Sequence, residues 1–340
     1  MKKTHLLFVT RSYPPLVGGL EQYCYDFYHS IKKNVKTTLL ARRPKENLLL
    51  FMARVKFHLL FHGRKYTHVH FGDGLLSVLG LPTRIMTKAK LSVVVHALEI
   101  MHPYPVYQFF MRHSLPRFDT VVCVSKNTEK EARKRGAKKT IVIPDGIVPK
   151  KHKVLDKKKL FAKLKIKPKG KILFSVGRQI PRKGVAWFVE HVMPKLSKDT
   201  FVIAGTGEEI PKITKIITEK KLTNVYLVGR VEEIIKESLY AHSDWFVMPN
   251  VRVPHDAEGF GITIIEAGLA GCPVVAASVD GIPSAVLVDK TGFLVKEKDA
   301  KGFIDIISKK KLVHSKVKKN VLERFNWEEI AKRYVKALKL

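Results

Sequence analysis

Short runs rich in valine, isoleucine, leucine and phenylalanine recur along the chain, and a turn and a helical stretch follow each of them. In the first half these runs are HLLFVT, TTLLAR, THVHFG, LSVVVH, TVVCVS and TIVIPDG. In the second half they are KILFSVG, TFVIAGTG, VYLVG, DWFVMPN, PVVAAS and GFLV. Strands without polar alternation are buried on both faces, as in a parallel sheet covered by helices. The pattern occurs twice and predicts an α/β protein with two doubly wound, Rossmann-like domains.

A length of 340 residues is also suited to about two domains. The basic, proline-containing stretch PKKHKVLDKKKLFAKLKIKPKGK separates the two halves and resembles a linker. We therefore expect a first domain over residues 1–160 and a second over 161–323. The last stretch, NWEEIAKRYVKALKL, has apolar residues at helical spacing after a capping asparagine. It predicts a C-terminal helix over 324–340 that packs toward the first domain.

The chain is strongly basic, with 63 Lys and Arg against 30 Asp and Glu and a formal charge of +33. This charge predicts attraction to an anionic partner: nucleic acid, an anionic membrane face or a phosphorylated substrate. The alternative is a lysine-rich surface without a specific partner. No run approaches the roughly 18 apolar residues of a membrane span, and the start reads as a buried strand, not a signal peptide. Three scattered cysteines without a CxxC pattern argue against disulfides and zinc, and favour a reducing cytosol.

Glycine and charge gather where the strands of the second half end. Ligands of open α/β sheets bind beyond the carboxyl ends of the strands. The segments at those ends are GRQIPRKG, GTGEE, GRVEE and PNVRVPHDAEGFG. Arg178 and Lys183 supply two cations suited to a diphosphate, although two solvated cations are the alternative. This concentration predicts a phosphate site in the second domain.

The run EGFGITIIEAGLAGCPVVAAS places two glutamates around a pair of glycines. Gly259 and Gly261 permit close approach of a ligand to the main chain, and a helix is expected from Ile262 onward. The free amides at its start would attract an anion. Glu258 and Glu266 would then accept hydrogen bonds from hydroxyls at either end of the ligand, which is the shape of a nucleotide-sugar. The alternative is one capping carboxylate and one on the surface.

These segments, in this order and spacing, resemble the retaining glycosyltransferases of family four, of GT-B fold. VGRQIPRKG, VIAGTGEE, VGRVEEIIKESLYAHSDWFVMPN and EGFGITIIEAGLAGCPVVAASVDGIP carry the resemblance in the second half. PPLVGGLEQY, VHALE, VVCVSKNTEKE and IPDGI agree with it more loosely in the first half. The resemblance implies two Rossmann-like domains facing across a cleft, the first for the acceptor and the second for the donor.

The resemblance also implies a role for individual residues. Arg178 and Lys183 would neutralise the donor diphosphate, Glu266 would bind the ribose, and Glu258 the transferred sugar. His96 would steady the sugar or the transition state, and Glu99 is a weaker candidate. The backbone positions expected to line the phosphates, the sugar and the base are Gly18, Gly19, Gly205, Arg230, Val231, Gly259, Phe260, Gly261 and Ile262. Asp145 departs from the family pattern, where asparagine is common.

The implied activity is transfer of a hexosyl unit from a UDP- or GDP-sugar with retention at the anomeric carbon. The family mechanism is front-face attack, which depends on positioning and on stabilisation of the departing diphosphate. No cofactor and no metal are expected, because the two cations supply the positive charge. The base, the sugar and the oligomeric state are left open.

Two stretches of the first half carry apolar and basic side chains. In residues 48–66, Leu48, Phe51, Met52, Val55, Leu59 and Leu60 share a helical stripe. Residues 104–118 combine aromatic side chains with arginines. Helices of this kind can lie on an anionic membrane, so a lipid-linked or surface-glycan acceptor at the inner face of the cell membrane is expected, with a role in cell-envelope glycan synthesis. The alternative is that both helices cover the first sheet.

Two other functions remain open at this stage. A nucleic-acid-binding α/β protein would fit the charge, although no zinc module, helix-turn-helix or RNP-like aromatic motif accompanies it. A sugar-nucleotide epimerase of the same fold would need acid and base groups and would turn over without an acceptor.

Overall fold

The computed structural model describes residues 4–16, 18–149 and 153–340, and the chain divides into two compact units. The first unit contains Met1–Val148, His255–Phe260 and Phe325–Leu340. The second contains Pro149–Pro254 and Gly261–Arg324. Each unit is built around one parallel six-stranded sheet, so the expected doubly wound α/β class is confirmed.

The sheet of the first unit has the order β2-β1-β3-β4-β5-β6, and every neighbouring pair is parallel. The chain moves to one side of β1 and then to the other, so a topological switch lies between β1 and β3. The strands coincide with the six apolar runs of the first half: β1 His5–Thr10, β2 Lys36–Ala41, β3 His68–Phe71, β4 Lys90–Val95, β5 Thr120–Cys123 and β6 Thr140–Val142.

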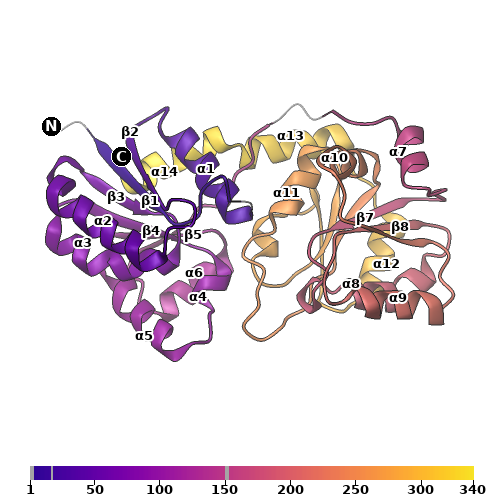
Figure 1. The fold of residues 1–340 in the computed structure, drawn as a ribbon. Helices are drawn as coiled ribbons and strands as arrows, with labels where there is room; N and C mark the ends of the chain where they lie inside the picture. The colour runs from indigo at the N-terminus through magenta and orange to yellow at the C-terminus, as the bar shows by residue number, and fades with distance from the viewer. Residues whose placement is uncertain (1–3, 17, 150–152) are drawn as a thin grey trace. The chain divides into compact units, whose positions relative to one another are not determined.

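Helices cover both faces of this sheet (Figure 1). Phe51, Val55 and Leu59 of α2 are buried in the core cluster on one face. On the other face, Phe27 of α1 packs against Phe8, with ring centroids 4.6 Å apart. The helices of this unit are α1 Gly19–Ile31, α2 Leu48–His62, α3 Gly80–Met86, α4 Ala97–Ile100, α5 Pro105–Ser114, α6 Lys126–Lys134 and α14 Trp327–Leu338, with short 3-10 turns η1 Gly63–Lys65, η2 Gly74–Leu79 and η3 Leu115–Arg117.

The sheet of the second unit has the order β12-β11-β10-β7-β8-β9 and is also parallel throughout. Its switch lies between β7 and β10, which are neighbours although β8 and β9 separate them in sequence. The strands are β7 Ile172–Val176, β8 Thr200–Ala204, β9 Val225–Gly229, β10 Trp245–Met248, β11 Val274–Ala277 and β12 Gly292–Val295. The helices and 3-10 turns are α7 Lys157–Lys163, η4 Pro181–Lys183, α8 Val185–His191, η5 Met193–Lys195, α9 Ile210–Glu219, α10 Glu233–His242, α11 Ile262–Leu269, η6 Ile282–Ser284, α12 Ala300–Lys309 and α13 His314–Phe325.

The unit boundaries differ from the expected domain boundary at residue 160. The segment before α7 groups with the second unit, because the backbone N–H of Leu155 donates to Ser238 Oγ at 2.8 Å and its carbonyl lies 2.7 Å from His242 Nε2. The short loop His255–Phe260 groups with the first unit, so the two glutamates of the EGFGITIIE segment belong to different units.

Helix α14 belongs to the first unit, where it packs against α1. Asn326 caps it, since its Oδ1 accepts from the backbone N–H of Glu328 at 3.0 Å. The side chains of Tyr23 and Tyr334 are buried, and their hydroxyls share a hydrogen bond of 2.5 Å. Each hydroxyl therefore has its partner in the core.

Tyr334→Phe leaves the Tyr23 hydroxyl buried without that partner. We expect a loss of about 1–3 kcal/mol in the free energy of unfolding, measured by urea denaturation. The double variant Tyr23→Phe/Tyr334→Phe removes both hydroxyls and should recover part of the loss. A loss in the double variant equal to the sum of the two single losses would show that the pair does not interact.

Candidate active site

The ends of β7 and β8 meet through two glycines in the second unit. Gly177 follows β7 with φ 141°, and Gly205 follows β8 with φ 111°. A Cβ on Gly205 would lie 2.0 Å from the carbonyl oxygen of Gly177, so a side chain there would collide with the neighbouring loop. A Cβ on Gly177 would lie 3.6 Å from Cε and 4.0 Å from Nζ of Lys183. The Lys183 ammonium therefore lies beside the end of β7, where the exposed Arg178 directly follows Gly177 in sequence.

The loop that carries Lys183 also contacts the end of β10. Gly184 has φ 64°, and a Cβ there would lie 2.1 Å from the carbonyl oxygen of Pro249. The start of α11 reaches the same strand, since a Cβ on Gly261 would lie 3.5 Å from Cε of Met248. Gly261 caps α11 with φ 96°, and Ile262 is its first residue. Lys183 and the free amides of α11 are thus both found at the β7–β10 switch, where open α/β sheets bind ligands.

Glu266 lies in the second turn of α11, and neighbouring side chains hold its carboxylate. Its Oε2 accepts a hydrogen bond from the Tyr240 hydroxyl at 3.1 Å and lies 3.7 Å from Nζ of Lys236. Burial lowers the pKa of Lys236, but Glu266 and Glu233 outweigh burial and raise it overall. Lys236 is therefore a cation at neutral pH, and the Glu266 side chain remains 27% exposed and accessible to a ligand.

Arg230 and Val231 follow the edge strand β9. Gly229 ends that strand with φ 64°, and its carbonyl accepts from the backbone N–H of Gly205 at 2.6 Å. Arg230 is exposed and Val231 is half-buried. The ends of β7, β8 and β9 are thus connected through backbone contacts along one edge of the second sheet.

In the first unit, His96 follows β4 and begins α4. Its ring lies edge-on to Tyr23 with centroids 4.9 Å apart, and its Nε2 is buried without a hydrogen bond to any described residue. Burial lowers the pKa of His96, while Asp145 and Asp73 oppose this effect. His96 is therefore a neutral imidazole at neutral pH. Its Nε2 can form a hydrogen bond with a bound group.

Glu99 and Asp73 fix the loops around His96. Glu99 Oε1 accepts from the backbone N–H groups of His96 and Gly74, both at 2.8 Å. Asp73 is fully buried and forms an ion pair with Arg11, whose Nε is 3.1 Å from Oδ2. Burial raises the pKa of Asp73 to about 6, against the attraction of Arg11. Glu99 thus has a clear structural role, as a capping carboxylate.

Asp145 follows β6 and lies in a buried position. Its Oδ1 has no hydrogen-bond partner among the described residues. Burial raises its pKa to about 6, although the nearby His96 lowers it. From the sequence, Asp145 is identified only as a departure from the family pattern, and Arg11 and Asp73 are not identified as site residues. Each of these residues lies within three residues of the end of a strand, and that position was the signal available in the sequence.

The remaining expected positions of the first unit are backbone sites. Gly18 and Gly19 lie at the start of α1, and a Cβ on Gly19 would have no atom within 4 Å. A Cβ on Gly259 would lie 3.4 Å from the backbone nitrogen of Ala97, so the loop with Glu258 runs beside the start of α4. The Phe260 ring is buried against Phe325 at 5.8 Å, which leaves only its main chain for a ligand.

Asp145→Asn should change the dependence of stability on pH. The folded state holds the Asp145 proton up to pH about 6, whereas the unfolded chain releases it near 3.8. Stability therefore falls as the pH rises through this window, by up to about 3 kcal/mol. The variant, which has no proton to lose, should melt at a higher temperature than the parent at pH 8, and should show a flatter profile between pH 4 and 6. Asp289→Asn, at an exposed position, is the matched control; identical pH profiles for parent and Asp145→Asn would contradict the burial effect.

Comparison with known proteins identifies the family. Residues 17–151 match the family model described as Glycosyltransferase Family 4, and residues 170–310 match that of Glycosyl transferases group 1. An uncharacterized glycosyltransferase of Methanocaldococcus jannaschii is 25% identical over 81% of this chain and 76% of its own. The GPI3 subunit of the phosphatidylinositol N-acetylglucosaminyltransferase of Saccharomyces cerevisiae is 24% identical over 97% of this chain and 74% of its own.

Solved structures agree on the fold. Anabaena HepE in complex with UDP superposes with a TM-score of 0.76 at 20% identity, over 99% of this chain and 100% of the other. The complex of the same protein with UDP-glucose gives a TM-score of 0.71 at 19% identity, over 98% and 99%. Two units, each with one parallel six-stranded sheet, are the elements of the GT-B architecture. The chain belongs to the glycosyltransferases of family four and has the GT-B fold.

Proposed function

We propose that the protein is a retaining hexosyltransferase that uses a UDP- or GDP-sugar and acts on a lipid-linked or surface-glycan acceptor at a membrane face. The observation that carries the donor assignment is the meeting of Lys183, Gly177, Gly205 and the start of α11 at one edge of the second sheet. The Anabaena structures with UDP and UDP-glucose support a nucleotide-sugar as the ligand at such an edge.

At this edge the diphosphate would meet positive charge from several sources. Lys183 would supply an ammonium, Arg178 a guanidinium, and the start of α11 its first amides. Gly261 and Gly205 leave the main chain uncovered, so a phosphate oxygen can approach the amides closely. These groups would stabilise the charge on the departing nucleotide without a metal ion.

Glu266 would accept hydrogen bonds from the ribose hydroxyls. Tyr240 and Lys236 hold its Oε2, which fixes the carboxylate before the ligand arrives. A carboxylate held in place loses less conformational freedom on binding than a free side chain does. Arg230 and Val231 would lie beside the base, and Glu258 with the amides of Gly259, Phe260 and Ile262 beside the sugar.

His96 would hydrogen-bond the transferred sugar through Nε2. Its buried, neutral imidazole suits this role better than that of a charged acid. With no side chain assigned as a covalent nucleophile, the proposed course is front-face attack, in which a donor phosphate oxygen takes the proton of the acceptor hydroxyl. An inverted anomeric linkage in the NMR spectrum of the product would contradict retention.

An outer apolar face of the first unit supports the membrane assignment. Leu49, Leu50, Phe57, Leu60 and Phe61 of α2 are between 61% and 74% exposed. Helix α3 packs beside α2 and adds Leu81 and Ile85, the latter 77% exposed. Of the stripe expected to face a membrane, Phe51, Val55 and Leu59 are instead buried against the first sheet, as the alternative expected. Leu60 is exposed, because α2 is apolar on both of its faces. Only one of these two faces of α2 packs against the sheet.

Helix α5 presents a second group of exposed side chains: Tyr104, Val106, Phe109 and Phe110. Exposed apolar patches larger than single side chains mark interaction surfaces, including membrane surfaces. None of the helices in the described ranges is long and apolar enough to cross a membrane. The name of the yeast relative, a phosphatidylinositol glycosyltransferase subunit, supports a lipid acceptor.

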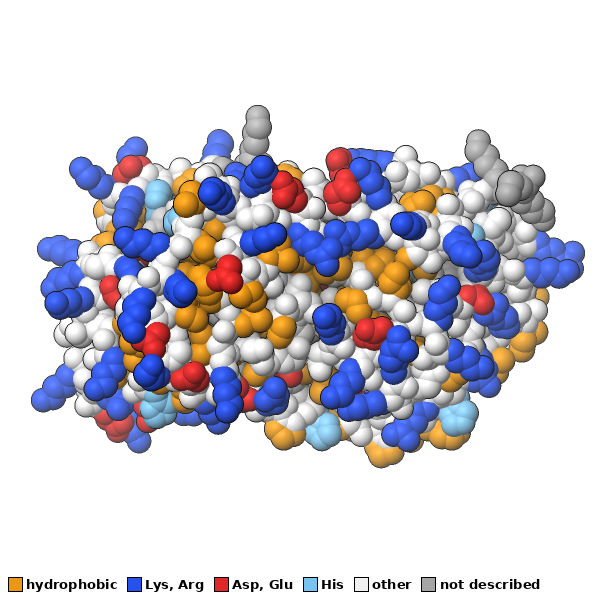
Figure 2. Space-filling view, turned by 180° about the vertical axis from the view of Figure 1, so that it is seen from behind, with side chains coloured by type: hydrophobic (Ala, Val, Ile, Leu, Met, Phe, Trp, Pro, Cys, Tyr) orange, Lys and Arg blue, Asp and Glu red, His pale blue; other side chains and the backbone are white. Residues whose placement is uncertain are grey.

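Lysine and arginine side chains are scattered over the face shown in Figure 2 and do not gather in one patch. A dispersed positive charge attracts an anionic bilayer, and the exposed apolar side chains would then insert. The same charge keeps nucleic-acid binding as the second candidate, which a salt-titrated RNA or DNA binding assay would detect. An epimerase would convert the donor without any acceptor.

Donor binding is expected to raise the melting temperature in a panel of UDP- and GDP-sugars. Glu266→Ala should weaken the binding of the stabilising sugar about 10- to 100-fold, because it removes a charged hydrogen-bond acceptor. Glu219→Ala, on the exposed face of α9, is the matched control and should bind like the parent. If no sugar nucleotide shifts the melting temperature of the parent, the donor assignment fails.

The membrane assignment is tested by co-sedimentation with vesicles that contain phosphatidylglycerol. Phe57→Ser/Phe61→Ser should lower the vesicle-bound fraction at least tenfold, since each phenylalanine contributes about 1.5–3 kcal/mol on burial. Val288→Ser/Val313→Ser removes exposed apolar side chains from the second unit and should bind like the parent. If both variants bind the vesicles equally, the apolar face of α2 does not mediate membrane attachment.

A further inference from the structure

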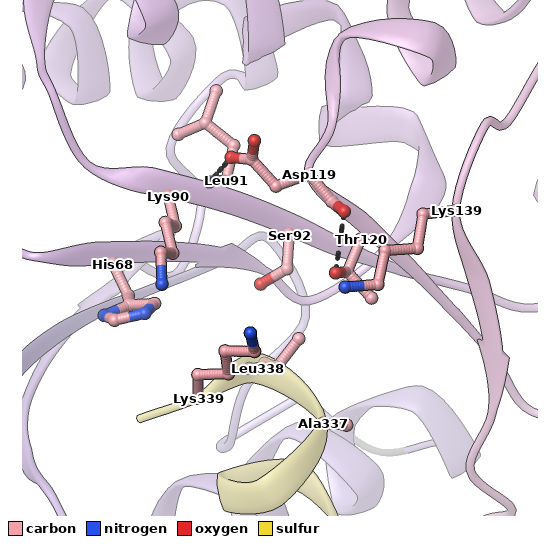
Figure 3. A pocket seen from close by; sticks show the side chains of 10 residues that line it. All are labelled: His68, Lys90, Leu91, Ser92, Asp119, Thr120, Lys139, Ala337, Leu338 and Lys339. Carbon is pink, nitrogen blue, oxygen red and sulfur yellow. Dashed lines mark hydrogen bonds between the residues drawn. The ribbon is translucent and has the colours of Figure 1, made fainter.

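A cavity of about 240 Å³ lies at the amino edge of the first sheet, where β3, β4 and β5 begin. The end of α14 closes it from the other side (Figure 3). Its lining residues are His68, Lys90, Leu91, Ser92, Asp119, Thr120, Lys139, Ala337, Leu338 and Lys339. Lys90 is the first residue of β4, while His96 follows the last, so a whole strand of about 17–20 Å separates the cavity from the candidate active site.

Three ammonium groups point into this cavity. Figure 3 shows the side chains of Lys90, Lys139 and Lys339 converging on the space beside the Ser92 hydroxyl. Within the described ranges, no ion pair involves any of the three. Like charges directed into one hollow repel each other, and an anion between them would offset this repulsion.

Asp119, the acidic residue in the lining, does not neutralise the three lysines. Asp119 Oδ2 accepts from Arg84 at 2.9 Å and from the backbone N–H of Leu91 at 2.7 Å. Its negative charge is therefore already matched by a guanidinium outside the cavity. The lining as a whole retains an excess of positive charge.

Hydroxyl groups complete the lining. Ser92 Oγ shares a hydrogen bond of 2.8 Å with His70 Nδ1, and a hydroxyl that accepts one such bond can still donate its own hydrogen. Thr120 donates to the carbonyl of Asp119 at 2.8 Å, and its oxygen lies at the same side of the hollow as Lys139. Burial and the nearby Lys90 lower the pKa of His68, so its ring is neutral and adds no charge.

We propose that this cavity binds a small phosphate-bearing anion, which Lys90, Lys139 and Lys339 hold together with the Ser92 hydroxyl. The volume exceeds the roughly 30 Å³ of one water and lies below the roughly 300–1,000 Å³ of drug-sized ligand sites, which suits inorganic phosphate or a phosphate monoester. Lys90 and Lys139 come from the sheet side and Lys339 from the end of α14, so the anion fastens this helix to the sheet. The other end of α14 carries Trp327, which packs on Gly146 beside Asp145.

Calorimetric titration with inorganic phosphate tests the site. The pocket variant is Lys90→Gln/Lys139→Gln/Lys339→Gln. The matched control is Lys88→Gln/Lys138→Gln/Lys336→Gln, which removes the same charge from exposed neighbours that do not line the cavity. All proteins carry Arg178→Gln/Lys183→Gln as well, so that phosphate cannot bind through those two cations. A thermal melt confirms that each is folded.

The control should bind phosphate saturably, and the pocket variant at least tenfold more weakly. A second arm uses vesicles with phosphatidic acid against pure phosphatidylcholine. If the protein binds phosphatidic acid only when the three lysines are present, and does not bind free phosphate, the site recognises the phosphate of a lipid headgroup. Equal affinity of pocket variant and control in both arms, or no saturable binding by the control in either, overturns the proposal.

Discussion

Parallel pairing of strands that are buried on both faces is the constraint on which the rest of this structure depends. It requires every connection to return over the sheet, so all carboxyl ends lie at one edge and all amino ends at the other. Gly177 and Gly205 can touch through their backbones only because β7 and β8 end side by side. The same rule gathers Asp73, His96 and Asp145, which lie far apart in sequence, at one edge of the first sheet.

That gathering carries an electrostatic cost. Asp73 and Asp145 are both buried and both interact with His96 and Glu99, and burial raises the pKa of both. Arg11 compensates the first, whereas the second interacts with His96, which lowers its pKa, and with Glu99, which raises it. Groups with such perturbed pKa values cluster at functional sites, where a ligand supplies the missing partners. In the second unit the carboxylate of Glu266 already has partners within the protein, namely Lys236 and Tyr240.

The first unit also carries surface features away from its candidate site. Helix α2 buries Phe51 and Val55 against the sheet while it exposes Phe57 and Phe61 to the outside. The amino edge of the sheet carries lysines around a hollow, far from His96. Under the proposed function, donor binding, acceptor binding and membrane attachment would each use a separate surface.

The sequence alone determined the twelve strands, the doubly wound class and the glycine-bearing segments of the second unit, because these follow from local hydrophobicity and from spacing along the chain. Tertiary structure decided what depends on distant residues. Asp145 is a buried acid beside His96, Leu60 is exposed, and residues 153–160 group with the second unit. Three lysines, one in β4, one just before β6 and one just after α14, line one cavity. A pattern within one segment specifies which face is apolar, but only packing determines which face is covered and which charges become neighbours.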